Sequence, residues 1–276
     1  MDPYAHSGGC SKGNPVVALD LSSGKTEVRL ERPWLNLPGM LGFSDEARGA
    51  VELNRLGALV TNPVSLAPRP PANPPRVVRY PGGFLLHTGH ANPGMRRVVG
   101  AHAPRWSHLG IPVLLSVLAQ NERELRRLVT GLEGVPEIAG LVLLLPPEAD
   151  AVSWLQLARE SERPVVALLP LGVTPEAARS VAEAGASAIL LGPPRGALAA
   201  GESLVQGRLY GPALYPLALR AARELAPILP IPLIVSGGID SPAHARTCLD
   251  AGAAAVGLDV ILWKDPQGIL ADAAWA

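Results

Sequence analysis

The chain has 276 residues, and its 24 Lys and Arg residues balance 24 Asp and Glu residues, so the formal net charge is zero. This balance argues against nucleic acid or an anionic membrane as the partner. With only Cys10 and Cys248, a disulfide scaffold is excluded and a reducing, cytoplasmic location is the default. Apolar runs such as 141–145 fall far short of the ~20 residues that span a bilayer.

The first residues, 1–14, lack the apolar core of a signal peptide and are expected to form a flexible leader. Residues 15–276 contain no segment typical of a linker, so one α/β domain is expected. From Val16, apolar and polar residues alternate on either side of a Ser-Gly turn. This pattern predicts a short N-terminal β-hairpin.

Beyond the hairpin, short apolar segments alternate with Ala-, Leu- and Arg-rich segments typical of helices. Ser44, Asn121 and Thr174 are expected to cap the helices that follow them. The predicted strands are 58–61, 112–118, 140–145, 164–169, 188–191, 233–236 and 254–258. The predicted helices are 45–56, 121–132, 149–160, 175–184, 214–225 and 242–251.

The predicted strands are continuous apolar runs, which indicates a parallel sheet buried on both faces. Counted from Leu35 there are about eight of them, which favours a (β/α)8 TIM barrel, with a doubly wound sheet as the alternative. Two connections, 63–83 and 192–212, are unusually long. Such loops after barrel strands usually cover a site at the carboxyl ends of the strands.

Several motifs occur in a fixed order along the chain. The N-terminal third holds LGFSDE, LNRLGALVT, NPPR and ANPG, and the C-terminal third holds GRLYGPALYPLALR and IPLIVSGGIDSPAHARTCLDAGAAAVGLDVILWKDP. Over residues 32–266 this ordered set resembles the class 1 dihydroorotate dehydrogenases, which are FMN-dependent TIM barrels of pyrimidine biosynthesis. The resemblance implies FMN across the barrel top, with its phosphate on backbone N–H groups after strands seven and eight.

The resemblance also places cofactor-binding positions on residues of this chain, several of which depart from the family pattern. Asn62 stands where the family has a lysine that contacts flavin and substrate. Arg208 replaces the second glycine of a pair, and Asp259 falls on a Gly-Thr pair that completes the phosphate site. The full set of candidate cofactor-binding residues is Gly39, Thr61, Asn62, Gly207, Arg208, Gly237, Gly238 and Asp259.

Further departures concern the chemistry. Leu86 and Leu168 fall on an asparagine and a second lysine of the family. The loop after strand four, where a Cys or Ser removes the substrate proton, reads LLLPPEAD. An aspartate at the phosphate position would cost on the order of 4 kcal/mol at an effective dielectric near 20. Without a base, proton abstraction would slow roughly 10²–10⁴-fold. FMN therefore remains a candidate cofactor, but a disfavoured one.

No residue is assigned as a catalytic base. Weak candidates are Glu148, after strand four, and His87 and His90 in HTGH, although no spacing here matches a metal signature. The simpler interpretation is local: the histidines hydrogen-bond within their loop, and Glu148 with Asp150 begins the next helix. Arg208 either clamps an anion or is an exposed loop arginine. Cys248 is expected in the core.

Three hypotheses follow. The first is a non-catalytic structural or regulatory homologue that has lost ordinary dihydroorotate oxidation and acts as a homodimer or as a heteromer with an intact relative. The alternative is an FMN-dependent oxidoreductase of the same family, acting on CH–CH groups of an altered substrate. The third is a non-flavin lyase or isomerase that uses His87, His90 or Glu148.

Overall fold

The computed structural model describes residues 18–44, 46–47, 49–146 and 149–271. In this part of the chain, eight parallel strands form one sheet in the order β3-β14-β13-β10-β9-β8-β7-β4. A parallel bridge between Leu35 and Ala58 joins the first strand to the last, so the sheet closes. The strands are β3 (Trp34–Asn36), β4 (Leu59–Val60), β7 (Val113–Leu118), β8 (Gly140–Leu144), β9 (Val165–Pro170), β10 (Ala188–Gly192), β13 (Leu233–Ser236) and β14 (Ala255–Leu258).

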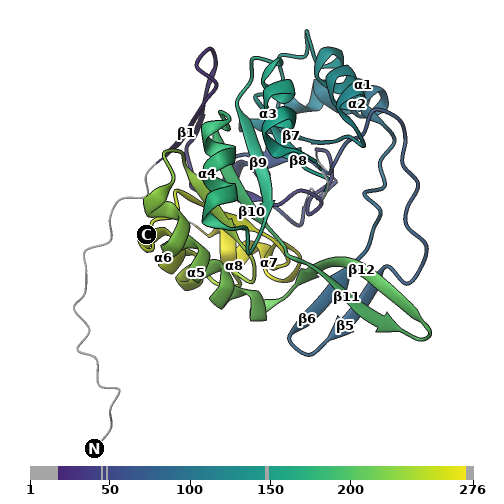
Figure 1. The fold of residues 1–276 in the computed structure, drawn as a ribbon, viewed down its shortest axis with the longest axis vertical. Helices are drawn as coiled ribbons and strands as arrows, with labels where there is room; N and C mark the ends of the chain where they lie inside the picture. The colour runs from purple at the N-terminus through teal and green to yellow at the C-terminus, as the bar shows by residue number, and fades with distance from the viewer. Residues whose placement is uncertain (1–17, 45, 48, 147–148, 272–276) are drawn as a thin grey trace, which may run out of the picture.

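Helices surround this barrel, as Figure 1 shows, so the predicted (β/α)8 fold is confirmed and the doubly wound alternative is wrong. None of the described helices is long and apolar enough to cross a membrane. The α-helices are α1 (Met95–Trp106), α2 (Glu122–Gly131), α3 (Ala151–Arg159), α4 (Pro175–Glu183), α5 (Tyr215–Leu225), α6 (Pro242–Asp250), α7 (Ile261–Lys264) and α8 (Pro266–Leu270). Short 3-10 turns are η1 (Leu53–Arg55), η2 (Pro212–Leu214) and η3 (Ala226–Ile228).

The predicted helix over 45–56 is wrong. Of the described residues in this range, only Leu53–Arg55 are helical, as the single 3-10 turn η1. Ser44 does not cap a helix, because its hydroxyl is hydrogen-bonded to Nδ1 of His102 at 2.7 Å. The Glu46 carboxylate instead accepts from the backbone N–H groups of Phe43 and Ser44. Local polar contacts therefore hold this segment as turns.

The N-terminal hairpin forms as predicted, from β1 (Leu19–Ser22) and β2 (Glu27–Leu30). Its hydroxyl and carbonyl groups bond to residues that precede barrel strands: Ser187 Oγ donates to Ser22 O, and Ser23 Oγ donates to Glu162 O. Leu21 and Leu30 of its two strands are fully buried. The hairpin thus closes the amino end of the barrel and leaves the carboxyl end for a site.

A second sheet stands at the carboxyl end, in the order β11-β12-β6-β5. Its strands are β5 (Val77–Tyr80), β6 (Gly83–Leu86), β11 (Arg195–Ala200) and β12 (Ser203–Tyr210). Strands β5, β11 and β12 lie within the two long connections predicted after strands two and six, and β6 begins where the first of them ends, although no strands were predicted there. Pairing of β12 with β6 joins the two connections, and Figure 1 shows the sheet extending from one side of the barrel.

Candidate functional site

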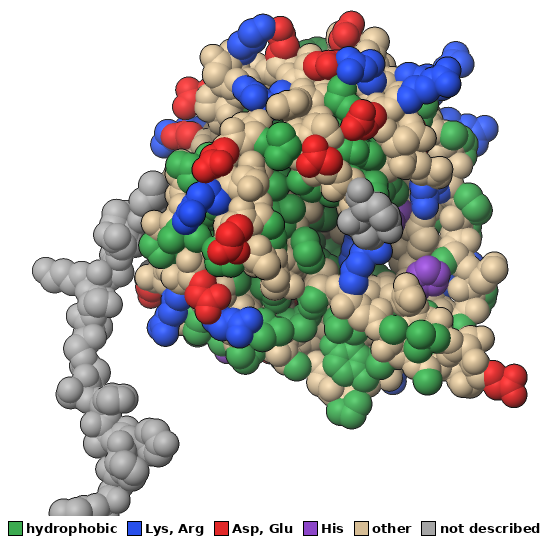
Figure 2. Space-filling model, in the orientation of Figure 1, with side chains coloured by type: hydrophobic (Ala, Val, Ile, Leu, Met, Phe, Trp, Pro, Cys, Tyr) green, Lys and Arg blue, Asp and Glu red, His purple; other side chains and the backbone are tan. Residues whose placement is uncertain are grey.

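Three cavities, of about 260, 390 and 300 Å³, lie where the second sheet meets the barrel mouth. All three are lined by Arg195 and Arg208, and two of them also by Arg69 and His90. The shared lining makes them parts of one cleft, called here the arginine cleft. Figure 2 shows basic side chains and a histidine beside the hollowed surface on this side of the molecule.

Arg208 lies on β12, so it is not the exposed loop arginine that the sequence allowed. Its Nη2 is 2.9 Å from Nε2 of His90. A guanidinium only donates hydrogen bonds, so this histidine nitrogen accepts and carries no proton. Burial, followed by the positive charges of Arg208, Arg69 and Arg195, lowers the pKa of His90 to about 3. His90 is therefore neutral at physiological pH and is a poor proton acceptor.

Two further polar residues lie near Arg208: Tyr210, at the end of β12, and Asp259, which follows β14. Burial raises the pKa of Tyr210 to about 12, with the Arg208 charge acting to lower it and the Asp259 charge to raise it. Asp259 is 3% exposed. Its Oδ1 accepts from the Val260 N–H at 2.6 Å, and its Oδ2 accepts from the Gly238 N–H at 3.4 Å. Burial raises the pKa of Asp259 to about 6, although these two N–H groups act to lower it.

One amide of the glycine pair expected to hold an FMN phosphate is thus already hydrogen-bonded within the chain. The Gly238 amide bonds to the Asp259 carboxylate. A Cβ on Gly238, which has φ +66°, would lie 2.6 Å from the Tyr215 backbone nitrogen and 2.7 Å from the Gly211 carbonyl oxygen. None of the three cavities is lined by Gly237, Gly238 or Asp259. The residues present do not fit the phosphate group of FMN.

The candidates after the first two barrel strands do not line these cavities either. Thr61 is buried, and its Oγ1 donates to Asn62 O and accepts from the Ser116 N–H, both at 3.0 Å. Asn62 Oδ1 accepts from the Gly42 N–H at 3.2 Å. Gly39 lies in a turn of the connection between β3 and η1. Asn62 thus connects the end of β4 to the segment between β3 and η1, and Thr61 connects it to β7.

Some of the remaining residues singled out from the sequence line the arginine cleft, and the others lie elsewhere in the structure. His87, Gly207 and Leu86 line the 260 Å³ cavity, and Leu168 lines the 390 Å³ cavity. Asp150 caps α3, where its Oδ2 accepts from the Ser153 N–H at 3.1 Å, as the local interpretation predicted. Glu148 lies outside the described residues. Cys248 is buried in the core, also as predicted.

Arg69, Arg195 and Tyr210 were not predicted from the sequence as site residues. The available signal was their position within the two long connections, which were themselves expected to cover a site. Pairing between β11, β12 and β6 brings them together. Among the described residues, no group of three or more His, Cys, Asp and Glu side chains is arranged to hold a metal ion.

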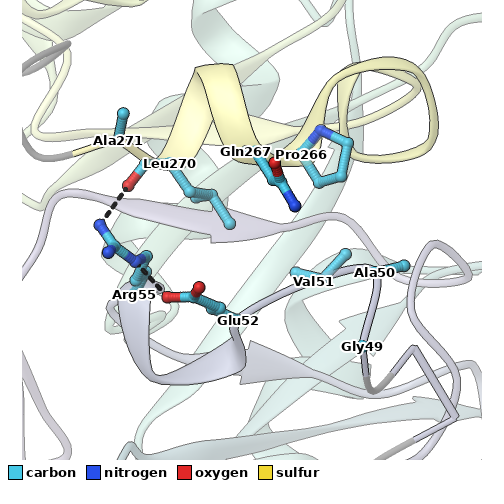
Figure 3. Close-up of a pocket in the computed structure, with 9 residues that line it drawn as sticks. All are labelled: Gly49, Ala50, Val51, Glu52, Arg55, Pro266, Gln267, Leu270 and Ala271. Carbon is cyan, nitrogen blue, oxygen red and sulfur yellow. Dashed lines mark hydrogen bonds and ion pairs between the residues drawn. The ribbon is translucent and has the colours of Figure 1, made fainter.

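A further cavity, of about 610 Å³, lies on the outside of the barrel between η1 and α8. Figure 3 shows that Arg55 spans it, with an ion pair to Glu52 and a hydrogen bond to the Leu270 carbonyl oxygen. None of the residues that line it was a candidate from the sequence. We place the candidate site in the arginine cleft, which is lined by four of the residues predicted from the sequence: His87, His90, Gly207 and Arg208.

Comparison with known proteins gives the family. The dihydroorotate dehydrogenase family model matches residues 21–145. The catalytic subunit of dihydroorotate dehydrogenase B (NAD(+)) from Desulforudis audaxviator is 32% identical over 272 residues, covering 90% of this chain and 88% of that protein. The subunit of the same name from Geobacter sulfurreducens is 30% identical over 271 residues, with 90% and 88% covered. The one from Pelobacter propionicus is 28% identical over 260 residues, with 86% of each covered. The chain belongs to the dihydroorotate dehydrogenase family.

Proposed function

We propose that this chain is a dihydroorotate dehydrogenase-like barrel that does not carry out ordinary dihydroorotate oxidation. It acts instead in the cytosol as a structural or regulatory homologue, either as a homodimer or with a catalytically intact relative. The observation that carries the proposal is the contact between the Asp259 carboxylate and the Gly238 amide. In this chain a carboxylate takes the place that the phosphate of FMN would need.

Electrostatics supports the loss of ordinary FMN binding. A phosphate brought to Gly238 would lie within a few Å of the Asp259 carboxylate, and at an effective dielectric near 20 the repulsion costs on the order of 4 kcal/mol. Turning Asp259 away would leave the Val260 and Gly238 N–H groups to find new acceptors. Buried groups left unpaired cost about 1–3 kcal/mol each.

Among the described residues of the cleft, no group is suited to remove the substrate proton. The described residues that line the three cavities include no Asp, Glu, Cys or Ser. His90, with its pKa near 3, and Tyr210, with its pKa near 12, lie far from the neutral range in which a general base works best. Leu86 and Leu168 add apolar surface where flavin and substrate need polar partners.

The first test is the visible absorption spectrum of the purified full-length chain, before and after addition of FMN. We expect a colourless protein that binds no FMN and does not oxidise dihydroorotate. The variant Asp259→Gly, which removes the competing carboxylate, should bind FMN more tightly than the wild type, whereas Asp150→Asn, at the cap of α3, should behave as the wild type. About one flavin per chain together with dihydroorotate turnover would overturn the proposal.

The second candidate function is an FMN-dependent oxidoreductase of the same family with an altered substrate. It is favoured by the retention of Gly237 and Gly238 at the end of β13 and by the coverage of nearly the whole length of the curated relatives. Flavin in the wild-type protein without dihydroorotate oxidation would support this candidate. Light scattering of the same preparation distinguishes a monomer from the proposed homodimer.

A further inference from the structure

We propose that the arginine cleft binds a small polyanion, a molecule with two or more carboxylate or phosphate groups, through Arg69, Arg195 and Arg208. This inference rests on the proposed function, because a flavin across the barrel mouth would compete for the same space. The ligand would lie between the second sheet and the barrel, away from Gly238 and Asp259. It would also explain a concentration of positive charge that the family chemistry does not use.

The pairing of the strands places two of the arginines side by side. In the register of β11 with β12, Arg195 is directly opposite Arg208, and Arg208 is in turn opposite Leu86 on β6. Like charges directly opposite each other destabilise an antiparallel pair. A bound anion between them would convert this repulsion into attraction.

No acidic side chain offsets these charges in the described part of the chain. None of the described ion pairs includes Arg69, Arg195 or Arg208. The described residues lining the three cavities are likewise free of Asp and Glu. All three arginines line two of the cavities together with His90, and their positive charges act to lower the pKa of this imidazole.

The guanidinium groups also retain donors for a ligand. Each has five N–H donors. Nη2 of Arg208 is paired with His90, and Nε of Arg69 donates to the Gly89 carbonyl oxygen at 3.3 Å, whereas the Arg195 side chain makes no hydrogen bond with a described residue. The planar fork of a guanidinium matches the paired oxygens of a carboxylate or a phosphate.

The rest of the lining fits an anion of small size. The 260 Å³ cavity adds polar groups from His87, Thr88 and Gln206 on the side of the second sheet. The 390 Å³ cavity is walled by apolar side chains of the barrel mouth, among them Leu144 and Leu168. The charged groups of the ligand would therefore lie toward the sheet and its carbon skeleton toward the barrel.

The test is isothermal titration of the full-length chain at low ionic strength with two probes, pyrophosphate and tricarballylate. We expect saturable binding of at least one probe, and the stronger one identifies phosphate or carboxylate as the ligand group. Arg195→Gln and Arg69→Gln should each weaken binding about tenfold or more, since a charge-assisted hydrogen bond contributes about 1.5–3 kcal/mol. Arg79→Gln, an exposed arginine of β5 that lines none of the three cavities, is the matched control and should bind as the wild type does.

A fold control separates binding from structure. Arg195→Gln removes one of two opposed like charges and breaks no hydrogen bond with a described residue, so its melting temperature without ligand should not fall below that of the wild type. Failure of both probes to bind the wild type, or equal affinity in the wild type, Arg195→Gln and Arg69→Gln, would overturn this proposal. Flavin in the preparation, seen in the absorption spectrum, would contradict the proposed function instead, and the titration would still decide the anion site.

Discussion

Asp259 is a buried carboxyl group whose pKa is raised from its ordinary value near 4 to about 6. Between these two values the unfolded chain is ionised here while the folded chain keeps the proton. The contribution of Asp259 to stability is therefore fully present below about pH 4 and is lost as the pH rises through about 6. The loss amounts to at most about 3 kcal/mol, because one pKa unit corresponds to about 1.4 kcal/mol.

We predict that Asp259→Asn removes this loss. An amide cannot ionise, so the free energy of unfolding of the variant should fall less than that of the wild type between pH 4 and pH 6.5. In the variant, one of the two carboxylate oxygens that accept from Val260 and Gly238 is replaced by an NH₂ group. At pH 7 the free energy of unfolding should therefore rise by less than the amount that ionisation of Asp259 removes from the wild type. Urea denaturation across this range measures the slope, and an unchanged slope would show that Asp259 does not titrate there.

His90 has the opposite dependence on pH. Burial and the neighbouring arginines hold its pKa near 3, whereas the unfolded chain takes up a proton near pH 6.5. Its contribution to stability is thus fully present above about pH 6.5 and is lost as the pH falls toward 3. His90→Gln, which keeps an acceptor for Arg208, should reduce this loss, whereas His108→Gln on the exposed surface should not. The slope of the free energy of unfolding against pH should change in the direction opposite to that of Asp259→Asn, and a change of the same sign would refute one of the two assignments.

Helices and strands were predictable where contacts between residues close in sequence determine where they begin and end. Asn121 and Thr174 cap α2 and α4 because each side chain accepts from a backbone N–H three residues along. Segment 45–56 was mispredicted because Ser44 bonds to His102, which is 58 residues away. Helix α1 was missed because it contains Pro104 and follows Gly94, an N-cap residue that offers no side-chain hydrogen bond.

The candidate site was only partly predictable for a related reason. The position of Asp259 after the last strand could be inferred from the order of motifs along the chain. The opposition of Arg195 and Arg208 depends on the register of β11 with β12, and their approach to His90 depends on the pairing of β12 with β6. The pairing of β12 with β6 and the contact of Arg208 with His90 join segments more than 100 residues apart, which periodicity within either segment cannot reveal.

The junction of β12 with β6 leads to a prediction at the scale of the element. Gly207 and Gly196 face each other across β11 and β12. A Cβ on Gly207 would lie 2.5 Å from the Leu86 carbonyl oxygen, which is backbone, whereas a Cβ on Gly196 would lie 2.8 Å from Cδ1 of Leu209, which can rotate. Gly207→Ala should therefore lower the free energy of unfolding by about 1–3 kcal/mol, and Gly196→Ala by less. If urea denaturation gave the same loss of unfolding free energy for both variants, β12 and β6 would move apart at no greater cost than the rotation of the Leu209 side chain.

At the scale of the whole molecule, the two ends of the barrel differ in how they are covered. The hairpin β1–β2 closes the amino end through apolar contacts, and the second sheet covers the carboxyl end with charged side chains. In TIM barrels the amino end generally serves stability and the carboxyl end carries the binding site. The chain keeps this division between its two ends.

The division predicts that stability and ligand binding can be changed independently. Leu30 is fully buried in the hairpin, so Leu30→Ala should lower the free energy of unfolding by about 2–5 kcal/mol. Because the arginine cleft lies at the opposite end, its affinity for pyrophosphate or tricarballylate should stay within about twofold of the wild type at a temperature where both proteins are folded. Arg195→Gln should show the reverse behaviour, with weak binding and unreduced stability. If Leu30→Ala weakened binding as strongly as Arg195→Gln, the two ends of the barrel would be coupled, and the cleft would depend on the packing of the whole barrel rather than on the second sheet.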